Sequence, residues 1–346
     1  MTGIIKGTGA YIPEYTLGNR ELEKLVETSD EWIQERTGIQ RRHIAAEETT
    51  ALMAAQAAKE AIEQAELGPE QIDMILVSTM SSEEAMPCTA CRVQNEIGAS
   101  HAVCFDLNAA CSGFIMAYVT ACAYIEAGLF RNILVIGSER LSRVIDWSDR
   151  GTCILFGDGA GAVVVAADEG QGAVPVLGSD GTKGDALTLN SGQNQNPFFS
   201  TLLRKNRFSQ MKKPYQDAES KKDKDHVQDS CFIQMDGQEV FKFAARKVPE
   251  AIEEVLGRNK LRKGDVKYYI LHQANKRIVE AVAKRIGEPA YKFPMNMQEY
   301  GNTSSASIPI LLWEMQKKNM LRPGDRLVLA GFGGGLTWGA VIITWR

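Results

Sequence analysis

Short apolar runs alternate along the chain with longer segments in which apolar residues recur at helical spacing. Residues 71–78, Gln-Ile-Asp-Met-Ile-Leu-Val-Ser, predict a short buried strand. Residues 51–67 before it are rich in alanine and glutamate and predict a helix, for which Thr49 and Thr50 are candidate N-caps. This alternation predicts an α/β fold in which helices cover the sheets. Further strands are predicted at residues 103–107, 132–137 and 162–166.

The same landmarks occur twice, in the same order. Glu-Ala-Ile-Glu precedes a predicted strand at residues 60–63 and again at residues 250–253. Each copy is followed by a strand, a polar turn, a long helix and another strand, and then by a glycine-rich turn and an apolar run. The regular alternation of strands and helices in any α/β protein explains the periodicity but not the shared order of these landmarks. The chain is therefore predicted to be duplicated. The later elements of the second half are predicted at residues 266–271, 292–295, 306–317, 327–330 and 339–343.

The duplication divides the chain into three parts. Residues 1–170 form a predicted N-terminal half, residues 231–346 a C-terminal half, and residues 171–230 a linker with an extended loop. If a pseudo-twofold axis relates the halves, Cys111 and Asn302 occupy matching places before a helix. Both then face the seam between the halves, where a ligand site is expected.

Residues 190–230 are polar, mixed in charge and weakly periodic. This pattern favours a mobile surface loop, and a lid is the functional alternative.

Composition and charge narrow the function classes. The 346-residue chain is 44% hydrophobic and 24% charged, which is typical of a globular protein with a well-buried core. Its net charge of -4 predicts no general attraction to nucleic acid or to an anionic membrane. No apolar run reaches the roughly 18 residues of a membrane span, and the first residues lack the pattern of a signal peptide. Seven scattered cysteines then indicate reduced thiols and a cytoplasmic location.

One cysteine lies where a nucleophile is expected. In Asn-Ala-Ala-Cys-Ser-Gly, residues 108–113, Cys111 joins a predicted strand to a predicted helix. The positive end of the helix dipole should lower the pKa of its thiol and raise the thiolate fraction. A free cysteine is more often a small buried hydrophobe, and the turn alone does not separate the two interpretations.

Polar clusters in the C-terminal half favour the catalytic interpretation. His272, one of only four histidines, ends a predicted buried strand, where a packing role suits it poorly. Asn302 precedes the matching helix, although it could simply be a helix cap. The glycines at 333–335 could form a turn, or could direct backbone N–H groups at an oxyanion. Together, at matched ends of a duplicated fold, these residues predict a Cys/His/Asn constellation.

Short motifs run in a fixed order along nearly the whole chain. In the first half they are TSDEWI (28–33), RTGI (36–39), AACSG (109–113), DRGT (149–152) and FGDGAG (156–161). In the second they are GQEVFK (237–242), HQAN (272–275), GNTS (301–304) and FGGGLTWG (332–339). In this combination the sequence resembles the β-ketoacyl-acyl carrier protein synthase III family of the thiolase superfamily. The resemblance implies a thiolase-like duplicated α/β fold, with two pseudo-twofold-related halves in five αβαβα layers, and a homodimer.

The resemblance also implies a reaction. Cys111 would take an acyl group from acyl-CoA. Malonyl-acyl carrier protein would then lose carbon dioxide, and its enolate would attack the acyl-enzyme to start fatty acid synthesis. His272 and Asn302 would stabilise the enolate, and the backbone N–H groups of Cys111 and Gly334 would bind the oxyanion. Carbon dioxide loss drives the reaction, so no cofactor and no metal is expected.

Binding contacts follow from the same resemblance. Trp32 and Arg150 would sandwich the adenine of CoA, because a guanidinium stacks on indole. Met86 stands where some members carry phenylalanine, and it would shape the acyl pocket across the dimer interface, admitting a longer or branched primer. Further CoA contacts would be Thr28, Arg36, Gly237 and Asn275. A basic patch for the acidic carrier protein would comprise Arg277, Lys284 and Arg285, although a solvated helix face explains the last two nearly as well.

Other functions stay open. The 190–230 loop is longer than is usual in the family, which leaves room for a related acyltransferase or a starter-unit condensing enzyme of a specialised, polyketide-type pathway. A degradative thiolase is disfavoured because a Cys/His/Asn set replaces the two-cysteine pattern expected there. A non-catalytic subunit is disfavoured because Cys111 is present. The sequence does not specify the acyl primer.

Overall fold

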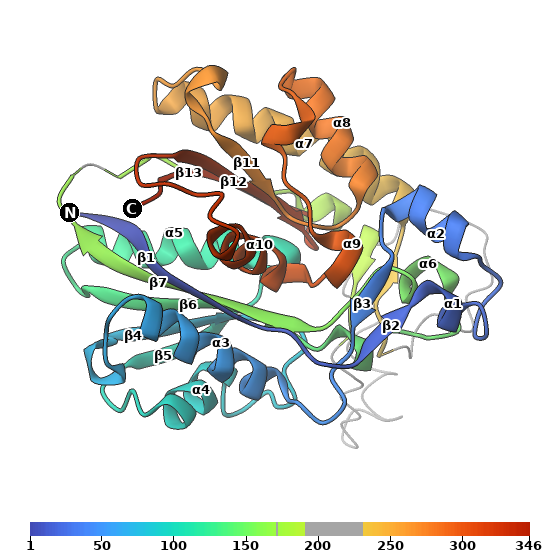
Figure 1. Ribbon diagram of the computed structural model, residues 1–346, viewed down its shortest axis with the longest axis horizontal. Helices are drawn as coiled ribbons and strands as arrows, with labels where there is room; N and C mark the ends of the chain where they lie inside the picture. Colours follow the sequence, from blue (N-terminus) through green and yellow to red (C-terminus); the bar gives the residue numbers. More distant parts are fainter. Residues whose placement is uncertain (171, 191–230) are drawn as a thin grey trace, which may run out of the picture.

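Five layers make up the fold (Figure 1). The computed structural model describes residues 1–170, 172–190 and 231–346, so nearly all of the predicted 190–230 loop lies outside the described residues. A β-sheet separates a central layer of two helices from an outer layer on each side. The outer layers are α3 (Thr50–Gln64) with α4 (Thr89–Ile97), and α7 (Gly237–Arg258) with α8 (Lys276–Ile286); the central layer is α5 (Gly113–Glu126) with α10 (Ser307–Lys317).

The first sheet has five strands in the order β1-β7-β6-β4-β5. Strand β4 is parallel to both β5 and β6, whereas β7 is antiparallel to β6 and β1 is antiparallel to β7. Every residue of β4 is buried, as expected for an apolar strand covered by helices on both faces. The strands are β1 (Thr2–Tyr11), β4 (Met74–Ser78), β5 (Val103–Leu107), β6 (Asn132–Glu139) and β7 (Gly159–Asp168).

The second sheet repeats this pattern with four strands, in the order β11-β12-β13-β8. Strand β11 is parallel to β12, β13 is antiparallel to β12, and β8 is antiparallel to β13. These four strands therefore correspond to β4, β6, β7 and β1, and the predicted duplication is visible in strand order and direction. The strands are β8 (Val176–Ser179), β11 (Tyr268–Leu271), β12 (Arg326–Gly333) and β13 (Thr337–Thr344).

Two boundaries differ from the sequence prediction. Strand β8 lies inside residues 171–230, so this part of the predicted linker belongs to the sheet of the C-terminal half. Residues 292–295 are not a strand, because a 3-10 turn covers Ala290–Lys292 and irregular chain follows it. Pro289 precedes this stretch and Pro294 lies within it, and a proline lacks the N–H that a sheet ladder requires.

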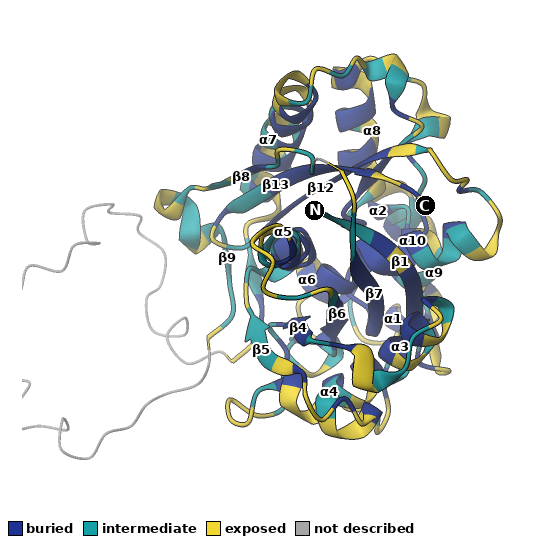
Figure 2. Ribbon diagram, turned by 90° about the vertical axis from the view of Figure 1, so that its left-hand side faces the viewer, coloured by how far each residue is buried: buried dark blue, intermediate teal, exposed yellow. Residues whose placement is uncertain are grey.

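The central helices lie in the most buried part of the molecule (Figure 2). Helix α5 is apolar nearly all round, which suits a helix with a sheet on each side. Helix α3 is confirmed close to its predicted bounds, and the Thr49 side chain caps it by accepting the Leu52 N–H at 3.1 Å.

Smaller elements border the layers. The strands are β2 (Thr16–Gly18), β3 (Arg41–His43), β9 (Leu187–Thr188) and β10 (Gln234–Met235). The short helices are α1 (Asn19–Leu22), α2 (Asp30–Thr37), α6 (Arg150–Cys153) and α9 (Met297–Tyr300). The 3-10 turns are η1 (Pro69–Gln71), η2 (Ala110–Ser112), η3 (Leu141–Arg143), η4 (Gly181–Ala186), η5 (Lys263–Asp265), η6 (Ala290–Lys292) and η7 (Ser304–Ala306).

The turns that precede the two central helices have the same conformation. Turn η2 leads into α5 and η7 leads into α10, and the first residue of each has a left-handed φ, 46° at Ala110 and 49° at Ser304. An asparagine two residues earlier accepts that residue's N–H, Asn108 at 3.2 Å and Asn302 at 2.9 Å. Asn302 therefore corresponds to Asn108. The expected match with Cys111 is wrong, because the counterpart of Cys111 is Ser305.

Candidate active site

Cys111, His272 and Asn302 line one cavity of about 500 Å³. They are 6%, 2% and 6% exposed, so the three side chains meet inside the protein rather than on its surface. The other walls come from both halves of the chain and are mostly apolar, as in most small-molecule sites. They include Leu155, Phe156, Leu187, Met235, Val240, Phe241, Ile278, Phe332 and Gly333.

Cys111 lies in the middle of η2, directly before α5. Gly333 fixes this turn, because a side-chain carbon there would lie 2.8 Å from the backbone nitrogens of both Cys111 and Ser112. Burial raises the pKa of the Cys111 thiol to about 12; the Ser304 hydroxyl opposes the rise, and the Glu139 carboxyl adds to it. The expected lowering by the helix dipole is thus outweighed by desolvation, and the resting group is a thiol that needs a base.

His272 follows β11, and its ring is hydrogen-bonded to Ser307, the first residue of α10. Its Nδ1 lies 2.7 Å from Ser307 Oγ, which also accepts the Gln273 N–H at 3.3 Å. Burial lowers the pKa of His272 to about 3, so the ring is neutral at physiological pH. Its Nε2 is buried without a partner in the described chain, and it is the ring nitrogen left for a ligand. The sequence analysis missed Ser307, whose only signal is its place at the start of the predicted helix.

Asn302 is fixed by main-chain and side-chain hydrogen bonds. Its N–H donates to Leu155 O at 2.9 Å, and its carbonyl accepts the Gly157 N–H at 3.1 Å. Since its side-chain oxygen already accepts the Ser304 N–H, the amide NH₂ is the part of the side chain left to donate to a ligand. Asn302 therefore closes a turn, as the structural interpretation expects, and it also lines the cavity.

The predicted oxyanion donors lie beside this turn. Gly333 lines the cavity, and the next residue, Gly334, faces Ala110 and Leu187. The participation of the Gly334 N–H stays a prediction.

The predicted adenine contacts are neighbours. The Arg150 guanidinium lies 5.0 Å from the centre of the Trp32 ring, and that of Arg36 lies 5.7 Å from it. A base held between Trp32 and Arg150 needs about 7 Å between their planes, two contact distances of about 3.5 Å. The Arg150 side chain must therefore swing outward to form the predicted sandwich. Thr28, four residues before Trp32, has a buried hydroxyl without a hydrogen-bond partner in the described chain.

Further predicted contacts line the same cavity as Cys111. These are Arg36, Gly237, Asn275 and Arg277. Asn275 caps α8 by accepting the Arg277 N–H at 2.8 Å, and its amide donates to Arg36 O at 3.1 Å, which joins α2 to α8 beside the cavity. The Arg277 guanidinium lies 5.6 Å from the centre of the Phe241 ring, on an exposed part of the rim.

The predicted basic patch is not a single cluster. Lys284 and Arg285 lie at the opposite end of α8 from Arg277, about 10 Å further along the helix axis. Arg285 lies 3.5 Å from Glu250, which partly neutralises it. Met86 is 88% exposed and does not line the cavity within one chain, so its role depends on a second copy.

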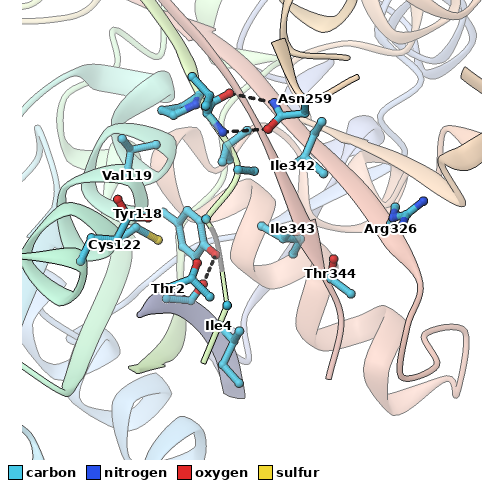
Figure 3. A pocket seen from close by; sticks show the side chains of 18 of the residues that line it. Thr2, Ile4, Tyr118, Val119, Cys122, Asn259, Arg326, Ile342, Ile343 and Thr344 are labelled. Atoms are coloured by element: carbon cyan, nitrogen blue, oxygen red, sulfur yellow. Dashed lines mark hydrogen bonds between the residues drawn. The ribbon is translucent and has the colours of Figure 1, made fainter. Parts of the chain in front are cut away.

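A larger hollow of about 650 Å³ lies at the other end of α5 (Figure 3). Tyr118 and Cys122 of α5, the start of β1 and the end of β13 line it. Asn259 exchanges two hydrogen bonds of 2.8 and 2.9 Å with the Val174 backbone at its edge. Cys122 is about 16 Å along the helix from Cys111, so this hollow is separate from the cavity of the three predicted catalytic residues.

Two kinds of feature are absent from the described residues. No helix there is both long enough and apolar enough to cross a bilayer. No group of three or more His, Cys, Asp or Glu residues there is placed to hold a metal ion.

Two family models match the chain. Residues 105–181 match 3-oxoacyl-[acyl-carrier-protein (ACP)] synthase III, and residues 256–345 match its C-terminal region. Cys111 and Arg150 fall in the first match, and His272 and Asn302 fall in the second.

Relatives and solved structures extend the likeness to the full chain. The β-ketoacyl-[acyl-carrier-protein] synthase III of Clostridium acetobutylicum is 44% identical over 99% of this chain and 98% of the relative. That of Desulfitobacterium hafniense is 45% identical over 99% and 97%. The crystal structure of 3-oxoacyl-[acyl-carrier-protein] synthase III from Aquifex aeolicus superposes with a TM-score of 0.87 at 41% identity, covering 99% of this chain and all of that one. The priming β-ketosynthase of the R1128 polyketide pathway gives 0.87 at 32% identity, covering 100% and 96%.

Proposed function

The chain belongs to the 3-oxoacyl-[acyl-carrier-protein] synthase III family of condensing acyltransferases, and on this premise we propose that Cys111 carries the acyl group in the reaction. The substrates are an acyl-CoA primer and malonyl-acyl carrier protein, and the product is a 3-oxoacyl-acyl carrier protein that initiates a fatty acid. The observation that carries the proposal is the convergence of Cys111, His272 and Asn302 on one buried cavity.

The first half-reaction is transfer to the thiol. Cys111 Sγ attacks the thioester carbonyl carbon, the bond to the CoA sulfur breaks, and the thiol proton leaves with CoA. A relay is needed because burial holds the pKa of the thiol at about 12. The unpartnered Nε2 of His272 suits this role when Nδ1 carries the ring proton and donates to Ser307.

The second half-reaction needs donors rather than a base. Malonyl-acyl carrier protein loses carbon dioxide, and negative charge develops on its thioester oxygen. The Asn302 amide and the His272 Nε2–H, in the tautomer in which Ser307 donates to Nδ1, both suit that oxygen. The enolate carbon then attacks the acyl carbonyl, the bond to Cys111 Sγ breaks, and the sulfur regains a proton. Loss of carbon dioxide drives this sequence, so the proposal includes no metal and no redox cofactor.

CoA and the carrier protein approach the same rim. Trp32, Arg36 and Arg150 supply a stacking and cationic surface for the nucleotide, and Gly237 and Asn275 lie along the path of the pantetheine. Arg277 is an exposed cation at the rim and suits the acidic carrier protein, whereas Lys284 and Arg285 are more distant.

Assembly and location complete the proposal. The exposed Met86 segment and the free edge of β5 are suited to a homodimer, in which Met86 reaches the partner's acyl pocket. All seven cysteines are free thiols, which suits the reducing cytoplasm.

A second candidate is a starter-unit condensing enzyme of a specialised pathway. The likeness to the R1128 priming β-ketosynthase, at 32% identity over the full chain, supports it. The two candidates share the chemistry and differ in the primer.

A primer panel with two readouts tests both candidates. Purified protein is mixed with acyl-CoA primers of graded length and branching and with malonyl-acyl carrier protein, while carbon dioxide and the mass of the Cys111 peptide are followed. Condensation with short fatty acid primers supports the main proposal. Condensation only with unusual starters supports the second candidate, and no condensation with any primer contradicts both.

A further inference from the structure

A buried carboxyl group lies under the turn that carries the site. Glu139, the last residue of β6, is 0% exposed, and within the described chain it has no ion-pair partner among the salt bridges. Burial raises the pKa of this carboxyl above its usual value. An ionised carboxylate without a cation is costly in such a place.

The Oε2 atom of Glu139 is the acceptor in each of its hydrogen bonds. Oε2 receives the Ser81 hydroxyl at 2.6 Å, the Met80 N–H at 3.2 Å and the Thr79 hydroxyl at 3.3 Å. Ser81 Oγ in turn accepts the Arg140 N–H at 2.8 Å, so its own hydrogen is free to point at Glu139. Oε2 therefore acts only as an acceptor and needs no hydrogen of its own.

The other oxygen, Oε1, shares the single hydroxyl hydrogen of Ser305 with a second acceptor. Oε1 lies 2.9 Å from Ser305 Oγ, and Ser305 Oγ lies 2.9 Å from the Ser78 carbonyl oxygen. A serine hydroxyl has one hydrogen, and a carbonyl can only accept. Both contacts are satisfied together if Ser305 donates to Ser78 and Oε1 supplies a hydrogen to Ser305.

We propose that Glu139 is a positioning residue held as a neutral carboxylic acid, whose Oε1–H donates to Ser305 Oγ and thereby fastens the Asn302 turn to the N-terminal sheet. Ser305 is the structural counterpart of Cys111 in the second half, and it directly follows Ser304, whose N–H closes the Asn302 turn. Glu139 thus joins β6 and the end of β4 to η7 by a chain of hydrogen bonds without placing a charge in the core.

Neutrality also matters for the nucleophile. An ionised Glu139 contributes to the raised pKa of the Cys111 thiol, and a neutral Glu139 removes this contribution, so the thiolate forms more easily. Two arginines lie nearby and have other partners: Arg143 reaches the Ser81 carbonyl at 3.5 Å and pairs with Glu83 at 3.8 Å, and the Arg140 side chain donates to Ala46 O at 2.7 Å. The relevance to catalysis rests on the proposed function, but protonation and thiol reactivity are measured without any condensation.

Asp158 is also a buried carboxyl, but its hydrogen-bond partners differ from those of Glu139 because all of them donate to it. It is 0% exposed, and it accepts the Ala45 N–H, the Ser142 N–H and the Ser142 hydroxyl at 2.6 to 2.9 Å. None of these partners needs a hydrogen from the carboxyl, so Asp158 is the matched control.

Infrared difference spectroscopy of the intact protein near neutral pH tests the proton directly. Subtraction of the Glu139→Gln spectrum from the wild-type spectrum should leave a protonated-carboxyl C=O band that shifts in heavy water. The same subtraction with Asp158→Asn should leave only carboxylate bands. Absence of the protonated band in the Glu139 pair overturns the proposal.

Thiol reactivity and melting temperature supply independent readouts. An amide mimics a neutral acid, with its oxygen toward Ser81 and its NH₂ toward Ser305 and the buried Ser304 hydroxyl. Alkylation of Cys111 by iodoacetamide near neutral pH should therefore agree within about twofold between wild type and Glu139→Gln. An increase of about tenfold, the effect of lowering the thiol pKa by about one unit, would mean that the wild type carries a charge there.

Glu139→Gln should also keep the wild-type melting temperature while Glu139→Ala loses several degrees, and equal losses in both variants contradict the positioning role.

Discussion

Asn302 and Asn108 occupy the same place in the two halves of the molecule. Each closes a left-handed turn by accepting a backbone N–H, from Ser304 at 2.9 Å and from Ala110 at 3.2 Å. Of the two, only Asn302 lines the cavity that contains Cys111 and His272. One copy of the duplicated turn therefore carries the proposed nucleophile, and in the other copy it is the asparagine that lines the cavity.

This dual role of Asn302 predicts a difference between two substitutions. Asn302→Asp retains the oxygen that closes the turn but loses the NH₂ donor, so the fold should survive. Acylation of Cys111 should proceed, while condensation should fall by about 100- to 1,000-fold, the usual cost of one oxyanion donor. Asn302→Ala should also acylate and fail to condense, with an additional loss of thermal stability. Full condensation by either variant contradicts the role of the amide.

Gly333 should be intolerant of even one methyl group. A side-chain carbon there meets the backbone of Ala109, Cys111 and Ser112 at 2.8 Å. Gly333→Ala should lower the free energy of unfolding by about 1–3 kcal/mol and displace the nucleophile, which denaturant titration and acylation rates measure. Gly257→Ala is the control, because its position in α7 has open space and alanine favours helix by up to about 1 kcal/mol. Equal behaviour of the two variants would show that the turn can relax.

His272 should make the folding stability of the protein depend on pH in the acidic range. Burial lowers its pKa to about 3, whereas the pKa of a histidine in the unfolded chain is about 6.5. Between these values the unfolded chain binds a proton that the native chain does not, so stability falls as the pH falls through this window. Relative to His272→Gln, the wild type should lose about 1.4 kcal/mol more per pH unit there. Parallel stability curves would mean that His272 is charged or exposed.

The contribution of Trp32 to CoA binding can be measured separately from the chemical step. Trp32→Ala should raise the KM for acyl-CoA by about tenfold, about the value of a desolvated cation–π contact, with little change in the acylation kcat. Arg262→Ala, which removes a surface ion pair with Asp265, is the matched control and should leave both constants unchanged. A large loss of kcat with an unchanged KM in Trp32→Ala would contradict the binding role.

Sequence reasoning reached the architecture because burial leaves a periodic signal. The α3 helix, strand β5 and the order of elements in both halves follow from patterns of apolar residues. It failed where a local pattern was overruled, as at residues 292–295, which include Pro294, and at β8, four residues that become a strand only by pairing with β13.

The site was predicted by residue type and not by geometry. Cys111, His272 and Asn302 come from distant parts of the chain, and their convergence depends on the packing of two sheets around α5 and α10. The raised pKa of Cys111 could not be predicted, because desolvation depends on the surrounding walls rather than on the helix start. The partnership of Glu139 with Ser305 spans 166 residues and leaves no local trace.

The most direct test follows the acyl group itself. The protein is incubated with acyl-CoA, digested and analysed by mass spectrometry, before and after addition of malonyl-acyl carrier protein. The acyl mass should appear on the peptide that contains Cys111 and on no other, and it should disappear as carbon dioxide and the 3-oxoacyl product form, while Cys111→Ala stays unmodified. An acyl group on another residue, or product formation by Cys111→Ala, would contradict the account.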